Sequence, residues 1–186
     1  MKRLRRFWLV AGACFAISIQ DLSAQEEERF LLFPKDKPVM EGQLPEGFKG
    51  AFRKDGTYLA VGPKSVMALV ALDKKVKDGA AAKSALPEFA KSFLLRSLSF
   101  RDMSTPTVDD AKLDRMFDDK EAAVAAKTLA ATGKNSDGDE MLVSATAFPW
   151  THRYYVLFAV CKPADKEQLE KDQRSVLQSI TEINDD

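Results

Sequence analysis

Two apolar runs near the C-terminus constrain the fold of this chain most. Residues 141–148 and 153–161 are rich in aliphatic, β-branched and aromatic side chains, and Pro149-Trp150-Thr151-His152 separates them. Apolar runs of this length, bounded by turn residues, are typical of buried strands. The pattern therefore predicts two consecutive strands joined by a short turn.

The segment after Pro163 predicts a terminal helix that covers these strands. Asp165 suits the N-cap, and Gln168 follows three residues later at the capping-box spacing. The expected apolar stripe consists of Leu169, Val176, Leu177, Ile180 and Ile183. Apolar hairpin strands need cover on at least one face. We therefore expect an α+β fold, with a mainly antiparallel sheet flanked by helices and a C-terminal amphipathic helix.

The first half of the chain predicts further elements. Residues 25–47 hold three prolines and Gly47, which predicts an irregular lead-in with at most one short strand, Phe30–Phe33. Lys49–Phe52 and Tyr58–Val61 flank an Asp-Gly pair that suits a tight hairpin. The apolar run at 66–72 predicts a central strand.

The middle of the chain predicts helical structure. Pro87 suits the first position of a helix over 87–98. Within 101–120, a short helix is expected because Leu113, Met116 and Phe117 keep helical spacing. Glu121–Thr132 has high helix propensity, yet it leads into a turn cluster and a strand, so both helix and strand stay open for it.

Residues 1–24 have the layout of a secretory signal peptide. Four basic residues precede an apolar run from Phe7 to Ile19, and Ala24 provides a small residue for cleavage. The run is shorter than the roughly 20 residues that span a bilayer. We expect a periplasmic or secreted protein that begins at Gln25. The alternative is a lipid anchor on Cys14, because Ala11-Gly12-Ala13-Cys14 resembles a bacterial lipobox.

Charge argues against nucleic acid as a partner. Cleavage after Ala24 removes Lys2, Arg3, Arg5, Arg6 and Asp21 from a chain with 28 basic and 28 acidic residues, so the mature net charge is −3. This balance lacks the basic footprint of a nucleic-acid binder. By the same measure the chain is a poor candidate for docking on anionic lipid.

The usual catalytic and metal-binding motifs are not found. The mature chain has one cysteine, Cys161, and one histidine, His152, which cannot build the usual zinc sets. No dinucleotide fingerprint or P-loop occurs, so we expect no metal and no cofactor. Cys161 ends an apolar run, which favours a buried structural thiol over a nucleophile. Asn135–Asp139 resembles a calcium loop, but Gly133 and Ser144 fall on two ligand positions, so a hairpin turn is expected.

The turn between the two C-terminal strands is the local feature that most favours binding. Trp150, His152 and Arg153 form an aromatic and basic cluster that could stack on a sugar or anchor a protein partner. As a contact surface, it requires Trp150 to be at least partly exposed. The alternative is that Trp150 packs over the sheet edge.

The order of elements resembles the PsbP-like fold, shared by photosystem II extrinsic proteins and DcrB-like bacterial envelope proteins. The resemblance covers 48–183: a helix near 87–98, strands at 125–132, 141–148 and 153–161, and a terminal helix ending in Ser175-Val176-Leu177-Gln178-Ser179-Ile180. It implies a strand at Ala125–Thr132 and an antiparallel sheet with helices on its faces. It also implies binding or assembly more often than catalysis.

These observations predict a signal peptide at 1–24, a lead-in at 25–47 and one α+β domain at 48–186. The expected function is that of an exported, non-enzymatic envelope protein that binds or scaffolds a partner, either an envelope protein or a glycan. The alternative is a small secreted hydrolase that uses His152 and nearby carboxylates.

Overall fold

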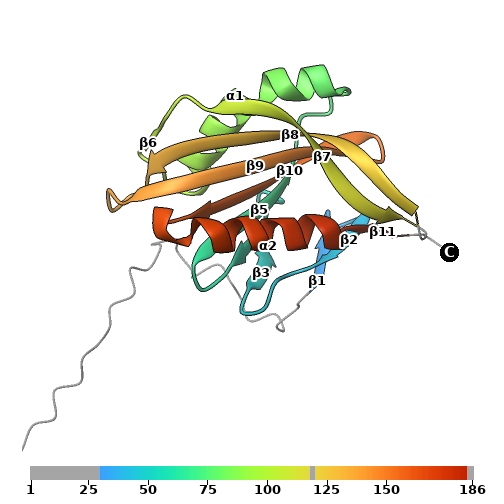
Figure 1. Ribbon diagram of the computed structural model, residues 1–186, viewed down its shortest axis with the longest axis horizontal. Helices are drawn as coiled ribbons and strands as arrows, with labels where there is room; N and C mark the ends of the chain where they lie inside the picture. Colours follow the sequence, from blue (N-terminus) through green and yellow to red (C-terminus); the bar gives the residue numbers. More distant parts are fainter. Residues whose placement is uncertain (1–29, 118–119, 184–186) are drawn as a thin grey trace, which may run out of the picture.

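The computed structural model describes residues 30–117 and 120–183 (Figure 1). The predicted signal peptide, with Cys14 and Ala24, lies outside these residues. No helix within the described part of the chain is long and apolar enough to cross a membrane. The fold is α+β, with a mainly antiparallel sheet and a C-terminal helix, as the sequence predicts.

The main sheet has eight strands among the described residues, in the order β3-β4-β5-β10-β9-β8-β6, and β7 also pairs with β8. Every pair in it is antiparallel. The bounds are β3 Lys49–Phe52, β4 Tyr58–Val61, β5 Ser65–Ala71, β6 Asp102–Met103, β7 Thr107–Phe117, β8 Lys120–Lys134, β9 Glu140–Trp150 and β10 Arg153–Cys161. The strands predicted around the Asp-Gly turn, at 66–72, at 141–148 and at 153–161 are confirmed.

β10 lies in the interior of the sheet and is buried on both faces. Val156 and Phe158 belong to the core beneath α1 (Gly79–Ser97), whereas Tyr155 and Leu157 belong to the core beneath α2 (Lys166–Ser179). Side chains alternate along a strand, so a continuous apolar run fills both cores at once. The two helices cover opposite faces of the sheet (Figure 1).

α1 begins eight residues before the predicted start at Pro87, which lies inside the helix. The Asp78 side chain caps the helix, accepting a hydrogen bond from the Ala81 N–H at 2.8 Å. The alanines that follow Asp78 favour helix, so the cap and the propensity agree on the earlier start.

The lead-in holds more structure than expected. β1 (Phe30–Phe33) is confirmed, but β2 (Met40–Gln43) pairs with it and with β11 (Thr181–Glu182). The prediction of at most one short strand is therefore wrong. β2 alternates buried and exposed side chains, and the inward Met40 is fully buried.

The capping box predicted for α2 is not formed. Asp165 occupies the N-cap, but its side chain makes no capping bond and pairs with Lys64 at 3.3 Å. The Gln168 side chain donates to Asp172 instead. A short 3-10 turn, η2 (Pro163–Asp165), leads directly into the helix. The apolar stripe is confirmed for Leu169, Val176 and Leu177, which are buried on α2. Ile180 is buried directly after the helix ends, whereas Ile183 follows β11 and is not part of the helix.

β7 and β8 form a long hairpin over residues predicted to be helical. The short helix expected within 101–120 is wrong, because Thr107–Phe117 pairs along its whole length with β8. The strand implied at Ala125–Thr132 is confirmed and extends over Lys120–Lys134. Pairing with a neighbouring strand overrides the helix propensity of these alanines, which is a weak preference in itself.

Candidate functional site

Trp150 does not form the surface anchor that its place in a turn suggests. Its side chain is 3% exposed and lies in the core beneath α2. The indole N–H donates to the Val39 carbonyl at 3.0 Å, which ties the turn to the end of the β1–β2 loop. The expectation of an exposed Trp150 is wrong, because a loop distant in sequence packs over it.

The other two residues of the predicted cluster differ in their exposure to solvent. His152 is exposed, whereas Arg153 is half-buried and donates from Nε to the Leu72 carbonyl at 2.8 Å. Partner binding at this turn stays a prediction. Only the His152 side chain extends freely into solvent.

Cys161 is a core residue, as expected. It is fully buried at the end of β10. Burial, together with the nearby carboxylates of Asp165 and Glu170, raises the pKa of its thiol to about 11. The thiolate that a nucleophile requires is therefore disfavoured at this position.

A groove runs between the first half of α2 and the strands β8 and β9. Its volume is about 410 Å³, which falls within the range of roughly 300–1,000 Å³ typical of ligand sites. We call it the α2 groove, and its lining residues are Ser104, Ala130, Ala131, Thr132, Leu142, Val143, Ser144, Lys166, Leu169 and Glu170.

Small side chains create the α2 groove. Ala130 pairs with Ser144 and Thr132 pairs with Leu142, so these residues share the face of the sheet that α2 covers. Elsewhere on this face, larger residues such as Phe148 fill the space beneath the helix. Alanine, serine and threonine leave that space open on one side of Leu169.

A buried polar network fixes α2 beside the groove. The Ser144 hydroxyl donates to Gln173 Oε1 at 2.8 Å, and Gln173 Nε2 donates to the Leu157 carbonyl at 3.2 Å. Gln173 is 6% exposed, so its bonds replace water that burial removes. At the rim, Lys166 and Glu170 form an ion pair of 3.7 Å. The groove thus offers apolar contacts and hydroxyls within, and charges of both signs at its mouth.

Sequence reasoning missed this site. A usable signal was present, because small or hydroxyl-bearing residues occupy every second position at Thr128, Ala130 and Thr132 and again at Ser144 and Thr146. Locating the groove also requires the register of β8 on β9 and the position of α2, which no local pattern supplies.

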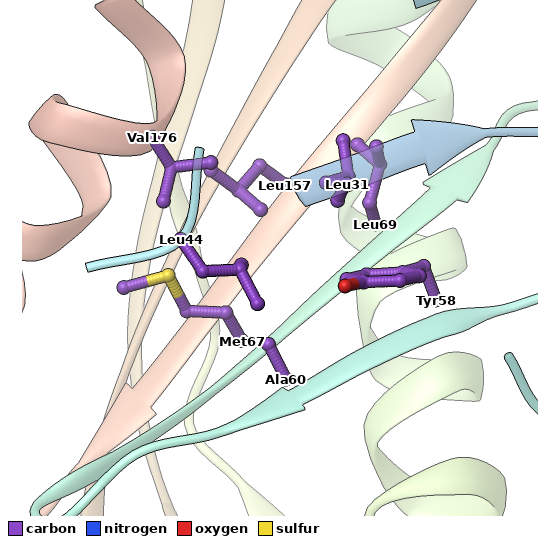
Figure 2. A pocket seen from close by; sticks show the side chains of 8 residues that line it. All are labelled: Leu31, Leu44, Tyr58, Ala60, Met67, Leu69, Leu157 and Val176. Carbon is purple, nitrogen blue, oxygen red and sulfur yellow. The ribbon is translucent and has the colours of Figure 1, made fainter. Parts of the chain in front are cut away.

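A second hollow lies inside the core beneath α2 and is much smaller. Its volume is about 10 Å³, and apolar side chains surround it (Figure 2). Leu157 and Val176 close it on one side, and Met67 and the Tyr58 ring on the other. It has room for about one water molecule and is a packing defect.

The polar segment that resembles a calcium loop forms a turn. Asn135 Oδ1 accepts hydrogen bonds from the Asp137 and Asp139 N–H groups at 3.0 and 2.8 Å, which confirms the hairpin turn predicted for Asn135–Asp139. Among the described residues, no three His, Cys, Asp or Glu side chains are grouped to hold a metal ion.

No protein-family model and no curated protein sequence matches this chain. Solved structures match it at low identity. The solution structure of cyanobacterial PsbP (CyanoP) from Synechocystis has a TM-score of 0.54 at 12% identity, covering 93% of this chain and 99% of that one. The chain therefore has a PsbP-like fold, as its element order predicts.

Two other matches have lower TM-scores. A crystal structure from Bacteroides thetaiotaomicron gives 0.48 at 9% identity, covering 86% of this chain and 50% of that one, so this chain spans about half its length. LpqN, described as involved in cell envelope biogenesis of Mycobacterium tuberculosis, gives 0.44 at 11% identity, covering 83% and 91% of the two chains.

Proposed function

We propose that this protein is exported to the cell envelope and binds a partner there in the α2 groove, without catalysing a reaction. The observation that carries the proposal is the groove itself, a space of about 410 Å³ beside a helix held in place by buried hydrogen bonds. A preformed cavity with a few placed polar groups is the usual form of a binding site.

The lining favours an extended segment of a partner protein as the occupant. Leu142, Leu169 and Ala130 offer apolar contacts, and the hydroxyls of Thr132 and Ser144 can bond a peptide backbone. None of the residues that line the groove is aromatic, so it lacks the flat ring face on which a sugar would stack. An envelope protein therefore fits the groove better than a glycan does.

Export and the absence of catalysis rest on separate observations. The first 24 residues have the order of a signal peptide. His152, the base that a hydrolase would use, is exposed and has no hydrogen bond to a carboxylate in the described part of the chain. The thiol of Cys161 is buried with a raised pKa, so it is poorly suited to act as a nucleophile.

A substitution that fills the α2 groove tests whether the partner binds there. Ala130 is exposed on the groove floor, so Ala130→Trp should occupy the space without disturbing the core. Ala125 is exposed on the same strand but lies outside the groove, which makes Ala125→Trp the matched control. Tagged variants are compared by co-purification from envelope extracts of the native host, with intact mass giving the N-terminus.

The expected result is a partner captured by the wild type and by Ala125→Trp, and lost with Ala130→Trp. Equal capture by both tryptophan variants would remove the groove from the proposal. A general hydrolase panel runs beside the capture experiment. Turnover that His152→Ala abolishes in a folded protein would instead establish the hydrolase alternative.

A further inference from the structure

Lysine side chains gather at the end of the sheet where β5 leaves it. The loop from β5 to α1 carries Lys74, Lys75 and Lys77, and all three are exposed. Arg153 lies beside this loop, because its Nε donates to the Leu72 carbonyl at 2.8 Å. The Leu72 N–H in turn donates to the Tyr154 carbonyl. The loop and the β9–β10 turn therefore form one continuous surface.

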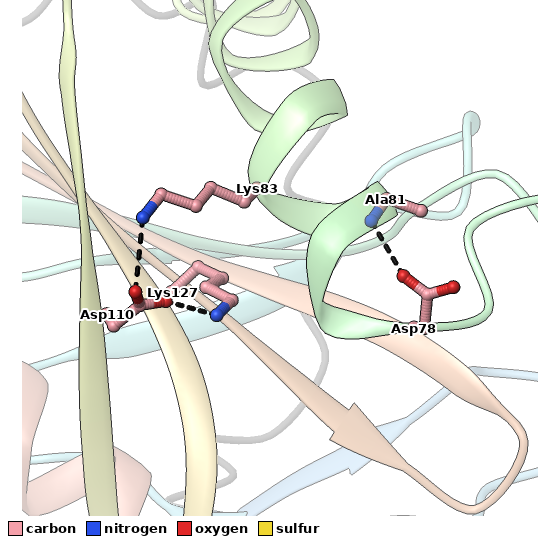
Figure 3. A network of polar contacts seen from close by, with 5 residues as sticks. All are labelled: Asp78, Ala81, Lys83, Asp110 and Lys127. Carbon is pink, nitrogen blue, oxygen red and sulfur yellow. Dashed lines mark hydrogen bonds and ion pairs between the residues drawn. The ribbon is translucent and has the colours of Figure 1, made fainter.

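Two further lysines extend this surface along the start of α1. Lys83 on α1 and Lys127 on β8 both reach the Asp110 carboxylate on β7 (Figure 3), with Lys83 Nζ at 3.1 Å. A Cβ built on Gly79 would lie 3.6 Å from Lys127 Nζ, which places that ammonium group next to the end of the loop. We call Lys74, Lys75, Lys77, Lys83, Lys127 and Arg153 the basic surface.

The carboxylates within the basic surface are already engaged. Asp73 accepts from the Lys75 N–H at 2.9 Å, and Asp78 accepts from the Ala81 N–H at 2.8 Å. Asp110 accepts from two lysines, whose hydrogen bonds hold its pKa below the usual value. The six cations thus exceed the three carboxylates, and each carboxylate has a structural partner.

The opposite end of the sheet has no such excess of cations. β9 connects the β8–β9 turn to the β9–β10 turn, so these two turns lie at opposite ends. The β8–β9 turn carries Asp137 and Asp139, and the link from β10 to α2 carries Asp165. Lys162 pairs with Asp139 at 2.9 Å and Lys64 with Asp165 at 3.3 Å. The excess of cations is therefore local to the basic surface, and the total net charge conceals it.

We propose that the basic surface docks the protein on anionic lipid headgroups. Lysines contribute compact, hydrated charges on flexible stems, which suit a fluid layer of anions. The nearby rings of Trp150 and Tyr154 are buried, so they give neither the exposed aromatic anchor of a protein interface nor a stacking platform for nucleic acid. A lipid surface needs neither.

Docking through the basic surface leaves the α2 groove accessible. Thr132 and Leu142 of the groove floor lie near the β8–β9 turn, at the end of the sheet opposite the β9–β10 turn. An anionic membrane that attracts the basic surface therefore faces away from the β8–β9 turn. The docking proposal does not depend on the groove having a partner.

Vesicle binding tests the proposal with the protein purified from its own host. The vesicles are pure phosphatidylcholine, or phosphatidylcholine with roughly one-third phosphatidylglycerol, at ~50 mM and ~500 mM salt. The readout is the ratio of partition coefficients on anionic and neutral vesicles, because a lipid anchor would contribute equally to both. Lys74→Gln, Lys75→Gln and Lys77→Gln are combined in one variant. The matched control combines Lys64→Gln, Lys134→Gln and Lys162→Gln, which remove the same charge at the opposite end of the sheet.

The wild type should prefer anionic vesicles at low salt and lose this preference at high salt. Each lysine near an anionic surface contributes roughly fivefold, so the loop variant should lose roughly a hundredfold of the ratio. The control should stay within about twofold of the wild type. Equal binding to both vesicles, or equal loss in both variants, would overturn the proposal. So would binding to random duplex DNA without binding to anionic vesicles under the same conditions.

Discussion

Removing the side chain of Trp150 should destabilise the fold strongly, although the residue stands next to a turn. The indole is 3% exposed, and its N–H donates to the Val39 carbonyl at 3.0 Å. Val39 also receives the Ile183 N–H at 3.4 Å, so this carbonyl joins the β9–β10 turn to β1, β2 and the C-terminal segment. Trp150→Ala therefore removes a contact between parts of the chain that are far apart in sequence.

The magnitude follows from the area and the hydrogen bond. A buried tryptophan removes about 150–250 Å² from water, which at about 25 cal/mol per Å² gives about 4–6 kcal/mol as an upper limit. The alanine that remains recovers part of this, whereas the lost hydrogen bond costs about 1 kcal/mol more. We expect Trp150→Ala to lower the free energy of unfolding by about 3–5 kcal/mol. Trp150→Phe keeps most of the ring and should cost about 2 kcal/mol.

Urea unfolding followed by circular dichroism measures these differences. His152→Ala is the control, because His152 is exposed two residues away and should change stability by less than about 0.5 kcal/mol. After cleavage at Ala24, Trp150 is the only tryptophan, so its fluorescence reports on this site. Its emission should be blue-shifted in the folded protein and move to the red on unfolding. A solvent-like emission maximum, or a loss in Trp150→Ala no larger than in the control, would refute the reasoning.

Three further predictions follow from single residues. Burial and a pKa of about 11 should keep Cys161 unreactive toward a thiol reagent in the folded protein and reactive in urea, so rapid native labelling would contradict the core assignment. A Cβ at Gly50 would collide with the Tyr58 ring, so Gly50→Ala should lower the free energy of unfolding by about 1–3 kcal/mol, which an unchanged urea midpoint would disprove. Hydrogen bonds from Lys127 and Lys83 hold the pKa of Asp110 below its ordinary value of 3.8. The stabilisation by the Asp110 carboxylate is therefore fully present above about pH 3.8 and is lost as the pH falls through the lower pKa of the folded state. The stability difference between wild type and Asp110→Asn should thus be larger at about pH 7 than at about pH 2, and equal differences would argue against the ion pairs.

The parts of the fold that the sequence predicts are those whose buried residues form a clear local pattern. β5, β9 and β10 hold apolar runs whose composition alone indicates a covered strand, and their bounds agree closely with the structure. The terminal helix is equally clear, because one stripe faces the sheet and the rest of the helix is charged. In these segments, local pattern and tertiary packing require the same residues.

β7 escaped prediction because its state depends on a partner strand. Leu113, Met116 and Phe117 have helical spacing, and acidic residues precede them as they would a helix. The strand forms because Thr107–Phe117 pairs with Lys120–Lys134, a hairpin whose second strand also joins β9. Neither half of this hairpin is strongly β-prone alone, so the preference arises only when the two are together.

The candidate sites show the same dependence on distant residues. Trp150 lies in a sequence context typical of an exposed turn, and its burial is caused by Val39, which is 111 residues away. The α2 groove requires Ala130 and Ser144 to pair across two strands and Gln173 to hold the helix beside them. Residue type indicates which side chains are small or polar, whereas the topology decides whether they surround a space.

Net charge has the same limit as a guide to partners. A sum over the mature chain gives −3 and argues against an anionic surface, because it treats every charge as equally placed. In the fold, Asp73 and Asp78 bond backbone amides, whereas Lys74, Lys75 and Lys77 extend into solvent between them. Interactions between exposed charges decay over about 8 Å at physiological salt, so a partner responds to the charges of one surface and not to the total. The basic surface can therefore attract an anionic membrane although the net charge of the mature chain is negative, and this attraction would orient the protein.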